Sequence, residues 1–405
     1  MNNALSKIKY GLLSYSTANL GDEIQSIAAR THLPQVDFLV NRESLDFFNE
    51  QNGYDYRLIL NGWFLHNPIR WPPAPLLNPL IISFHITNLS ENISGLNLTP
   101  AQILLSDANL EYLHQHAPIG ARDLHTLRLL EANKVDAYFS GCLTLTLPER
   151  AEQQVEDVVY LVDLDNEIVN HCMSKIDSEI RILSHIDNHT LDPLARLAKA
   201  EGILNKYQKA KAVVTSRLHA ALPCLAMKVP VLLINCQTDQ YRFEGLKNLV
   251  RNVNREQFLA GHYDFDFKYP TRNSDQYYLY RNLLLQKIAA FIDPTFAKSN
   301  ISNKLVQESL LWARLAQQRL NDRTKENLAS ELSELKEKLA QSQELLTIAE
   351  TNIANLRSLE CSLQKQLITL QNENDQLKGL LKILNDIKEE KSLIKKLRYL
   401  YKFFG

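Results

Sequence analysis

The fold of this chain is decided by a stretch that reads Ala212 Val213 Val214 Thr215 Ser216 Arg217 Leu218 His219 Ala220 Ala221 Leu222 Pro223. Its apolar and β-branched start predicts a strand that ends at Thr215 or Ser216, and a helix is predicted to begin near His219. A strand followed directly by a helix is typical of parallel α/β sheets, which bind ligands outside the carboxyl ends of their strands. Arg217 and His219 are therefore expected at a ligand site.

Similar β-rich runs alternate with helix-like stretches through the first 295 residues, at 10–15, 57–60, 80–84, 158–162 and 229–235. The polar residues 148–157 precede a fresh apolar strand and mark a boundary. We therefore expect an α/β fold with two Rossmann-like domains, at residues 1–150 and 151–295. No Gly-x-Gly-x-x-Gly or Walker sequence follows any of these strands, so an ordinary dinucleotide or ATP site has no support.

The architecture is expected to change near residue 295, because the last proline is Pro294 and only two glycines follow it. After a helical linker at 296–327, leucines recur at alternating steps of four and three residues, which predicts a coiled coil over 328–384. A rise of ~1.5 Å per residue makes this segment a rod of roughly 85 Å. The core positions are 332, 339, 346, 353, 360, 367, 374 and 381, and 328, 335, 342, 349, 356, 363, 370, 377 and 384.

Asn374 occupies one of these core positions, where a polar residue favours a two-stranded parallel pairing, so we expect a homodimer. The alternative is a helical hairpin within one chain, but no Gly/Pro turn interrupts the segment. Residues 385–405 form a basic, aromatic and amphipathic tail that fits an anionic membrane surface. A partner-binding tip and the frayed end of the rod are rival interpretations of this tail.

Composition excludes some function classes. The net charge of −1 gives no general attraction to nucleic acid. The first ten residues lack the apolar stretch of a signal peptide, and no apolar run is long enough to span a bilayer, so a cytoplasmic protein is expected, with membrane association at the inner face through the tail. The five cysteines lack metal-ligand spacing, and we expect reduced thiols and no metal site.

Three further clusters carry polar groups. Asn19 Leu20 Gly21 Asp22 follows the first strand and opens a helix, where free backbone N–H groups favour anionic or hydroxylated ligands. Arg122 and Asp123 open a second helix, where Asp123 also fits a plain helix cap. Residues 139–147 resemble a short strand entered through Ser140 Gly141 Cys142. Arginine binds phosphate or carboxylate with two donors and histidine transfers protons near neutral pH, which suits an anionic substrate that needs protonation.

Taken in order, these pieces resemble the polysaccharide pyruvyl transferases, which move pyruvate from phosphoenolpyruvate onto sugar hydroxyls as a ketal. The matching residues are Asn19 to Asp22 with Gln25, Gly120 to Asp123, Ser140 to Leu145 and Ser216 to His219. The resemblance spans roughly residues 8–290. It implies a fold like that of two-domain glycosyltransferases of the GT-B type, with the site in the cleft between the halves, and a role in surface polysaccharide (exopolysaccharide) biosynthesis.

The resemblance also implies roles for individual residues. Arg122 matches the family arginine at the phosphoenolpyruvate site, and Arg217 with His219 matches its Arg-x-His pair, with His219 as acid or base. Arg242 stands where the family tends to place a donor-binding lysine, so charge is kept while a fork replaces a point donor. The acceptor side is assigned to Asn19, Gly21, Asp22 and Asp123. Residues 60–64 lack the glycine run of many members, so the acceptor sugar is not inferred.

The expected function is therefore a pyruvyl transferase with phosphoenolpyruvate as donor, no cofactor, and a glycan or lipid-linked sugar as acceptor. Two alternatives stay open. The first is a GT-B-type glycosyltransferase that uses a nucleotide sugar, since fold does not fix function. The second is a non-catalytic assembly protein that acts through its coiled coil.

Overall fold

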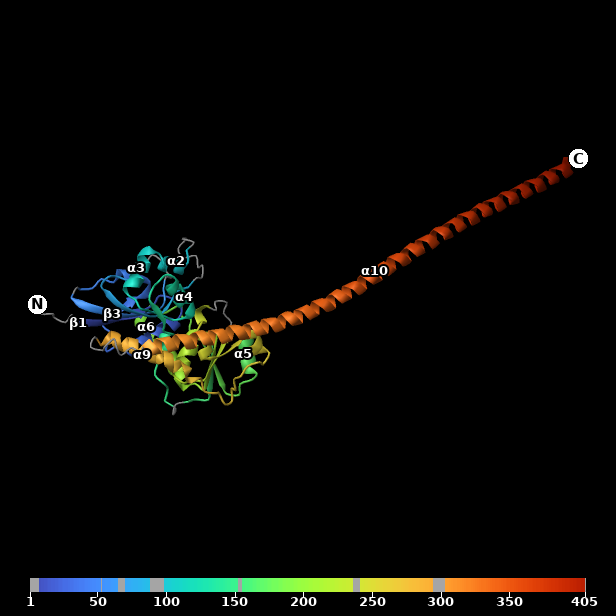
Figure 1. Cartoon of the computed structure of the whole chain (residues 1–405). Helices are drawn as coiled ribbons and strands as arrows, with labels where there is room; N and C mark the ends of the chain where they lie inside the picture. The colour runs from blue at the N-terminus through green and yellow to red at the C-terminus, as the bar shows by residue number, and fades with distance from the viewer. Residues whose placement is uncertain are drawn as a thin grey trace. The chain divides into compact units, whose positions relative to one another are not determined.

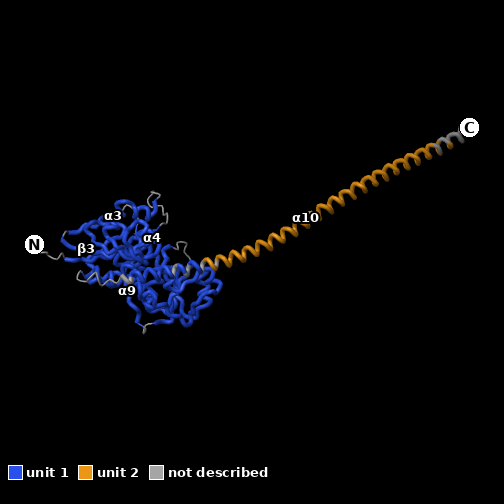
Figure 2. The backbone as a smooth tube through the Cα atoms, viewed as in Figure 1, with its two compact units in different colours: residues 1–322 blue, residues 323–405 orange. Residues whose placement is uncertain are grey.

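The structure, a computed structural model, describes residues 7–51, 53–64, 70–87, 98–151, 155–235, 241–293 and 303–404. The chain divides into two compact units, residues 1–322 and 323–405 (Figure 2). The first unit holds two parallel β-sheets with their helices. The second is the distal part of one long helix, α10 (Figure 1).

The first sheet has the strand order β2-β1-β3-β4-β5-β6 in the described residues, and all its neighbouring strands are parallel. Its strands are β1 (Lys7–Ser14), β2 (Phe38–Asn41), β3 (Tyr54–Trp63), β4 (Leu77–His85), β5 (Ile119–Ala121) and β6 (Ala137–Phe139). The apolar middle of β3 and β4 is buried on both faces because helices cover both. These helices are α1 (Gly21–Arg30), α2 (Pro100–Leu104), α3 (Asp107–Gln115) and α4 (Leu124–Ala132), with the 3-10 turn η1 (Arg42–Phe47).

The second sheet has the order β11-β10-β9-β7-β8 and is also parallel where it is described. Its strands are β7 (Val158–Val162), β8 (Glu179–Leu183), β9 (Ala212–Thr215), β10 (Val231–Asn235) and β11 (Arg251–Asn254). Its helices are α5 (Asn166–Met173), α6 (Pro193–Lys209), α7 (Leu218–Ala226) and α8 (Arg255–Leu259), and short 3-10 turns follow at η4 (Tyr241–Phe243), η5 (Lys247–Leu249) and η6 (Asp275–Tyr277).

Two parallel-sheet α/β parts and a long C-terminal helix are therefore confirmed. Every predicted strand up to residue 235 is present except the one expected at 139–147, which was wrong. There β6 ends at Phe139, and Gly141 adopts a positive φ of 72° that turns the backbone into a 3-10 helix, η2 (Leu143–Thr146). The whole of η2 is buried and packs on α1 and α7, so its apolar residues fill the space between helices.

The two sheets are joined by direct packing within the first unit. Helix α1 of the first sheet packs on α6 of the second, and α7 of the second packs on η2. Helix α9 (Tyr278–Ile292) returns to the first sheet, where the Tyr10 hydroxyl donates a hydrogen bond to the Ile292 carbonyl at 3.1 Å. These contacts hold the carboxyl ends of strands from both sheets in one region.

Helix α10 spans Asn303–Phe404 without a break, through the described residues assigned above to the linker, coiled coil and tail. The hairpin alternative is therefore wrong. Residues 296–302 of the predicted linker and residue 405 of the predicted tail lie outside the described residues. Ala313 is buried on the first unit, and Arg314 lies 3.6 Å from the carboxylate of Glu131. None of the helices that the structure describes is long and apolar enough to cross a membrane.

Candidate active site

The predicted site residues follow strand ends in both sheets. Arg122 and Asp123 come directly after β5, and Arg217 and His219 follow β9. The loop that contains Asn19 to Asp22 follows β1 and opens α1. Because the strands are parallel, their carboxyl ends meet at one edge of each sheet.

Arg122 is a buried cation with few partners. Its side chain is 1 % exposed, and its Nε lies 3.5 Å from the Asp123 carboxylate. Within the described residues, neither its Nε nor one of its Nη atoms makes a hydrogen bond. A buried charge with unused donors is costly unless it is neutralised, so this guanidinium favours an anionic ligand.

Asp123 is fully buried and already bonded. One carboxylate oxygen accepts hydrogen bonds from the backbone N–H of Thr126 at 2.9 Å and from its hydroxyl at 2.8 Å, which caps α4. The other lies 2.6 Å from Nδ1 of His85, at the end of β4. Burial alone would raise the pKa of Asp123, but His85, Arg122 and the Thr126 hydrogen bonds together lower it below its usual range. Asp123 is thus a charged carboxylate within the chain's own network.

His219 is the second residue of α7 and is 5 % exposed. Burial lowers its pKa well below 6.5, and the nearby charge of Arg122 lowers it further, while Asp22 opposes the shift and Arg242 adds to it. The structure therefore brings Arg122, Arg242 and Asp22 within electrostatic reach of His219. Its Nε2 is buried and makes no hydrogen bond to the described part of the chain.

The β1–α1 loop touches His219 directly through Gly21. A Cβ atom added at Gly21 would lie 3.0 Å from the Cβ of His219 and 3.0 Å from Oδ1 of Asn19. That Oδ1 accepts a hydrogen bond from the Gly21 N–H at 3.1 Å. The glycine is therefore required for the close approach of α1 to α7.

Asp22 is held by several donors. Its carboxylate accepts from Arg42 Nη1 at 3.0 Å and from the Thr17 hydroxyl at 3.2 Å, and the Gln25 amide approaches its other oxygen at 3.4 Å. Asp22 thus joins the buried Arg42 to the loop that contacts His219.

Arg242 lies on η4, which follows β10 of the second sheet in sequence. Its side chain nevertheless contacts the first sheet. The N–H of Leu124 donates to the Glu244 carbonyl at 3.2 Å, and the rings of His125 and Tyr241 lie 4.9 Å apart. These contacts place the guanidinium carbon of Arg242 5.5 Å from the centre of the Trp63 ring, at the end of β3. Residues 236–240, which precede it, lie outside the described residues.

Arg217 is oriented by a carboxylate of the second sheet. Its Nε donates to Asp163 at 3.1 Å, and its side chain is 29 % exposed. Asp163 also accepts from the backbone N–H of His185 at 3.0 Å. Burial lowers the pKa of His185 to about 4, and Arg217 adds to that effect against Asp163. The described contacts thus place the Arg217 side chain beside Asp163 and His185, and none of them joins it to Arg122 or Arg242.

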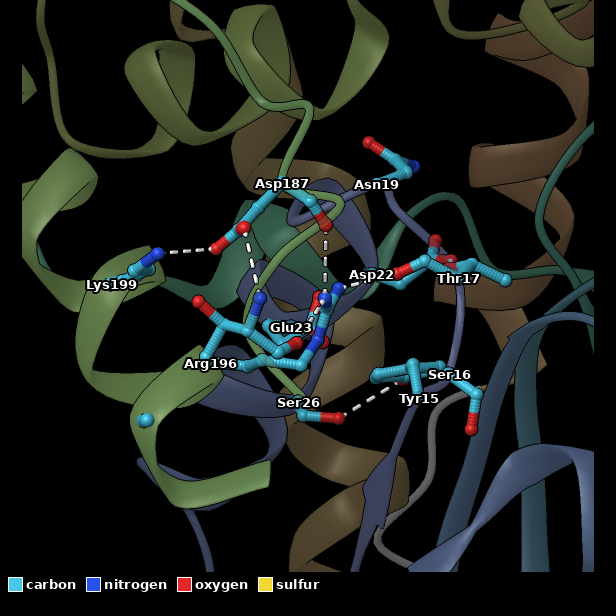
Figure 3. A network of polar contacts seen from close by, with 12 residues as sticks. Tyr15, Ser16, Thr17, Asn19, Asp22, Glu23, Ser26, Asp187, Arg196 and Lys199 are labelled. Atoms are coloured by element: carbon cyan, nitrogen blue, oxygen red, sulfur yellow. Dashed lines mark hydrogen bonds and ion pairs between the residues drawn. The ribbon is translucent and has the colours of Figure 1, made fainter. Parts of the chain in front are cut away.

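A polar network ties the β1–α1 loop to the second sheet. Figure 3 shows Arg196 and Lys199 of α6 reaching Glu23 and Asp187. Arg196 is buried, forms an ion pair with Glu23, and donates to the Thr17 carbonyl at 2.6 Å. Backbone hydrogen bonds join the same segments, from Leu20 N–H to the His185 carbonyl and from Asp187 N–H to the Ala18 carbonyl, both at 2.8 Å.

Sequence reasoning missed His85, His185 and Asp163. His85 directly follows the predicted strand 80–84, so the rule that singled out Arg217 also applies to it. His185 follows the edge strand β8, whose residues are mostly exposed and form no apolar run. Asp163 follows the predicted strand β7 and takes a positive φ of 51° that the sequence does not reveal.

Taken together, the site offers the buried guanidinium of Arg122, the half-buried one of Arg242 and a glycine-dependent loop. It also offers imidazoles with lowered pKa values, each with one nitrogen that makes no hydrogen bond within the described residues. Asn61, at an irregularity of β3, adds a fully buried amide that makes no hydrogen bond to the described residues. Across the same residues, no three His, Cys, Asp or Glu side chains are grouped to hold a metal ion. The arrangement is able to bind a small anion and to transfer protons to and from it.

Comparisons with known proteins address the family. Among solved structures, an uncharacterized protein from Klebsiella pneumoniae subsp. pneumoniae is 11% identical over 59% of this chain and 88% of its own, with a TM-score of 0.34. A structure of the wall teichoic acid polymerase TagF is 9% identical over 78% of this chain and 90% of its own, with a TM-score of 0.35. Both likenesses are too distant to support an inference. No curated protein matches the chain.

The family model for polysaccharide pyruvyl transferases matches residues 19–238, which is more than half of the chain. The matched region includes Asn19, Arg122, Arg217 and His219, and it ends before Arg242. The chain therefore belongs to the polysaccharide pyruvyl transferase family and is a polysaccharide-modifying transferase.

Proposed function

We propose that this protein transfers pyruvate from phosphoenolpyruvate onto two hydroxyls of one sugar as a ketal, in surface polysaccharide biosynthesis. The observation that supports this most is the buried guanidinium of Arg122, which acts electrostatically on His219. Within the described residues, two of its nitrogens and Nε2 of His219 make no hydrogen bond. A ligand with both a phosphate and a carboxylate supplies the negative charge that this group lacks.

The proposed chemistry uses the chain's own residues and no cofactor. Arg122, Arg217 and Arg242 hold the phosphate and carboxylate of the donor, and His219 delivers a proton to its methylene carbon. A sugar hydroxyl attacks the electrophilic carbon, phosphate leaves, and a neighbouring hydroxyl closes the ketal. Fixed cationic donors stabilise the charge that develops at each stage. Asn19, Gly21 and Asp22 position the acceptor side through the β1–α1 loop.

The ligands that bind distinguish a pyruvyl transferase from a glycosyltransferase that uses a nucleotide sugar. Phosphoenolpyruvate should raise the thermal unfolding midpoint, whereas a panel of nucleotide sugars should not. The reverse result favours a glycosyltransferase with a GT-B-like arrangement of the two sheets. Absence of any turnover favours an assembly protein.

Loss of His219 tests the proposed chemistry. His219→Ala should abolish acceptor-dependent phosphate release while the protein stays folded. Unchanged release would remove His219 from the reaction.

The long helix supports a second part of the proposal, a parallel homodimeric coiled coil over residues 328–384. Leucines at its core positions are more than half exposed in the single chain, among them Leu332 at 54%, Leu335 at 62% and Leu363 at 56%. Complete burial of a leucine contributes about 1.5–3 kcal/mol, so a seam of such residues strongly favours a second copy. Analytical ultracentrifugation measures the resulting mass.

The tail supports a third part, contact with the anionic inner face of a membrane by a cytoplasmic protein that acts on a lipid-linked sugar. Lys391, Lys395, Lys396, Arg398 and Lys402 supply the positive charge. The full-length protein should sediment with anionic liposomes at low salt, and a chain truncated after residue 384 should not. Equal behaviour of the two chains would remove the tail from membrane binding.

A further inference from the structure

Asp123 orients the ring of His85 so that its Nε2 can accept a proton. Asp123 is a charged carboxylate 2.6 Å from Nδ1 of His85, so the neutral ring carries its proton on Nδ1 and donates it to Asp123. The opposite nitrogen, Nε2, then presents a lone pair. This atom is buried and makes no hydrogen bond within the described residues. The orientation of a histidine by a buried carboxylate is the arrangement of known general bases.

His85 lies within electrostatic reach of the same two arginines as His219. Burial lowers the pKa of His85 to about 4, Asp123 opposes this, and the charges of Arg122 and Arg242 lower it further. The same two arginines act on His219. The ring of Trp63, which packs under Arg242, lies 6.4 Å from the His85 ring in an edge-on contact. Two imidazoles with unused Nε2 atoms therefore border one cationic region.

We propose that His85, oriented by Asp123, is the general base that takes the proton of the first attacking sugar hydroxyl, opposite His219 as the general acid. This inference rests on the proposed pyruvyl transfer. It makes His85 a catalytic residue and Asp123 a positioning residue that acts through His85.

The two imidazoles balance the reaction. Protonated His219 gives its proton to the methylene carbon of phosphoenolpyruvate, while the oxygen of the first hydroxyl bonds to the central carbon and its proton goes to Nε2 of His85. Protonated His85 then gives this proton to the leaving phosphate as the carbon–oxygen bond to phosphate breaks, and the electron pair stays on phosphate. The second hydroxyl bonds to the carbon and returns a proton to His219. Both residues end as they began.

Binding of phosphoenolpyruvate changes the protonation of His85 and His219. A phosphate and a carboxylate beside Arg122 and Arg242 offset the positive charge that keeps both rings neutral, so the pKa of each imidazole rises on binding. His219 then takes up a proton before the first step. His85 becomes a stronger base, and its raised pKa means that it too takes up a fraction of a proton when the donor binds. Wild-type protein should therefore take up protons when it binds phosphoenolpyruvate.

The test compares His85→Asn with His171→Asn. In His85→Asn the amide keeps a donor toward Asp123 and lacks Nε2. His171 of α5 is a matched control, because its Nε2 is also buried without a hydrogen bond to the described chain and its ring packs on Phe258 at 5.0 Å, outside the proposed site. Proton uptake is measured by calorimetric titration with phosphoenolpyruvate in buffers of different ionisation enthalpy. Turnover is measured as phosphate release with methyl glycosides of glucose, galactose and mannose.

We expect His85→Asn to bind phosphoenolpyruvate within about threefold of wild type, to take up fewer protons, and to lose about 10²–10⁴-fold in kcat. His171→Asn should match wild type, and added imidazole should restore part of the kcat of His85→Ala. Unchanged proton uptake in His85→Asn overturns the inference even if the three glycosides are poor acceptors, and so does unchanged kcat. Failure of wild-type protein to bind phosphoenolpyruvate instead overturns the proposed function itself.

Discussion

Two buried arginines of this protein differ in their partners, and this difference predicts opposite effects on stability. Arg42 is 3% exposed and donates to Asp22 at 3.0 Å and to Glu43 at 2.7 Å, with its guanidinium 4.7 Å from the centre of the Tyr15 ring. Arg122 is as deeply buried, but its nearest paired carboxylate oxygen, on Asp123, lies 3.5 Å away and is already bonded to His85.

Replacement of each arginine by methionine therefore has a different cost. Arg42→Met leaves Asp22 and Glu43 without their cation, and removal of one partner of a buried pair costs about 3–5 kcal/mol of unfolding free energy. Arg122→Met removes a charge that the fold hardly compensates, while Asp123 keeps His85 and Thr126 as partners. Replacement of a whole buried ion pair by apolar side chains is neutral or stabilises a protein by about 1–4 kcal/mol. Because Asp123 keeps its other partners, we expect Arg122→Met to change stability in the same direction.

The assay is urea unfolding followed by the fluorescence of the three tryptophans, Trp63, Trp71 and Trp312, all in the first unit. We expect a higher midpoint than wild type for Arg122→Met and a lower one for Arg42→Met. Turnover of Arg122→Met should fall at least about 100-fold, because the more stable variant has lost the cation that binds the anionic donor. If Arg122→Met is instead destabilised as much as Arg42→Met, Arg122 is a structural residue and the reasoning fails.

Three other predictions follow from single contacts. Gly21→Ala brings a Cβ to 3.0 Å from the Cβ of His219, so the packing of α1 on α7 must shift, and both kcat and the unfolding midpoint should fall. An unchanged kcat would show that this contact does not position His219. Leu363→Glu places a charge in the predicted coiled-coil seam, so sedimentation should show a shift toward monomer, whereas Arg357→Glu outside the seam should not. The pKa of His85 is about 4 in the folded chain and 6.5 in the unfolded chain. Between these pH values the unfolded state binds more protons than the folded state. The free energy of unfolding should therefore fall as the pH falls from 6.5 to 4, by on the order of 3 kcal/mol for this group. Unfolding of His85→Asn at pH 7 and 4.5 checks that window, and a slope as steep as that of wild type would refute it.

The α/β fold was predictable because its central strands are buried on both faces and therefore read as continuous apolar runs. Strand β8 was not, because it lies at the edge of its sheet, where its residues are exposed or half-buried and form no continuous apolar run. Strands β5 and β6 have three residues each, too few for a periodic signal. The expected strand at 139–147 failed for a different reason: apolar residues also fill a buried 3-10 turn, and only the backbone at Gly141 distinguishes the two.

Site residues were predictable where a strand end and a charged side chain coincide in sequence, as at Arg122 and Arg217. The contact of His85 with Asp123 was not predictable, because the two residues are 38 positions apart in sequence and meet only through the pairing of β4 with β5. Arg242 was placed by resemblance, and its approach to Trp63 depends on contacts of residues 241–244 with α4 that the sequence does not reveal.

The central claim is that Arg122, Arg242 and His219 surround a single site for a small, multiply charged anion. Calorimetric titration of phosphoenolpyruvate into wild-type protein and Arg122→Met tests it most directly. We predict one site per chain in wild type and an affinity at least about 100-fold weaker in Arg122→Met, with Arg314→Met, on α10, unchanged. Equal affinity in wild type and Arg122→Met, or no binding to either, would contradict the claim.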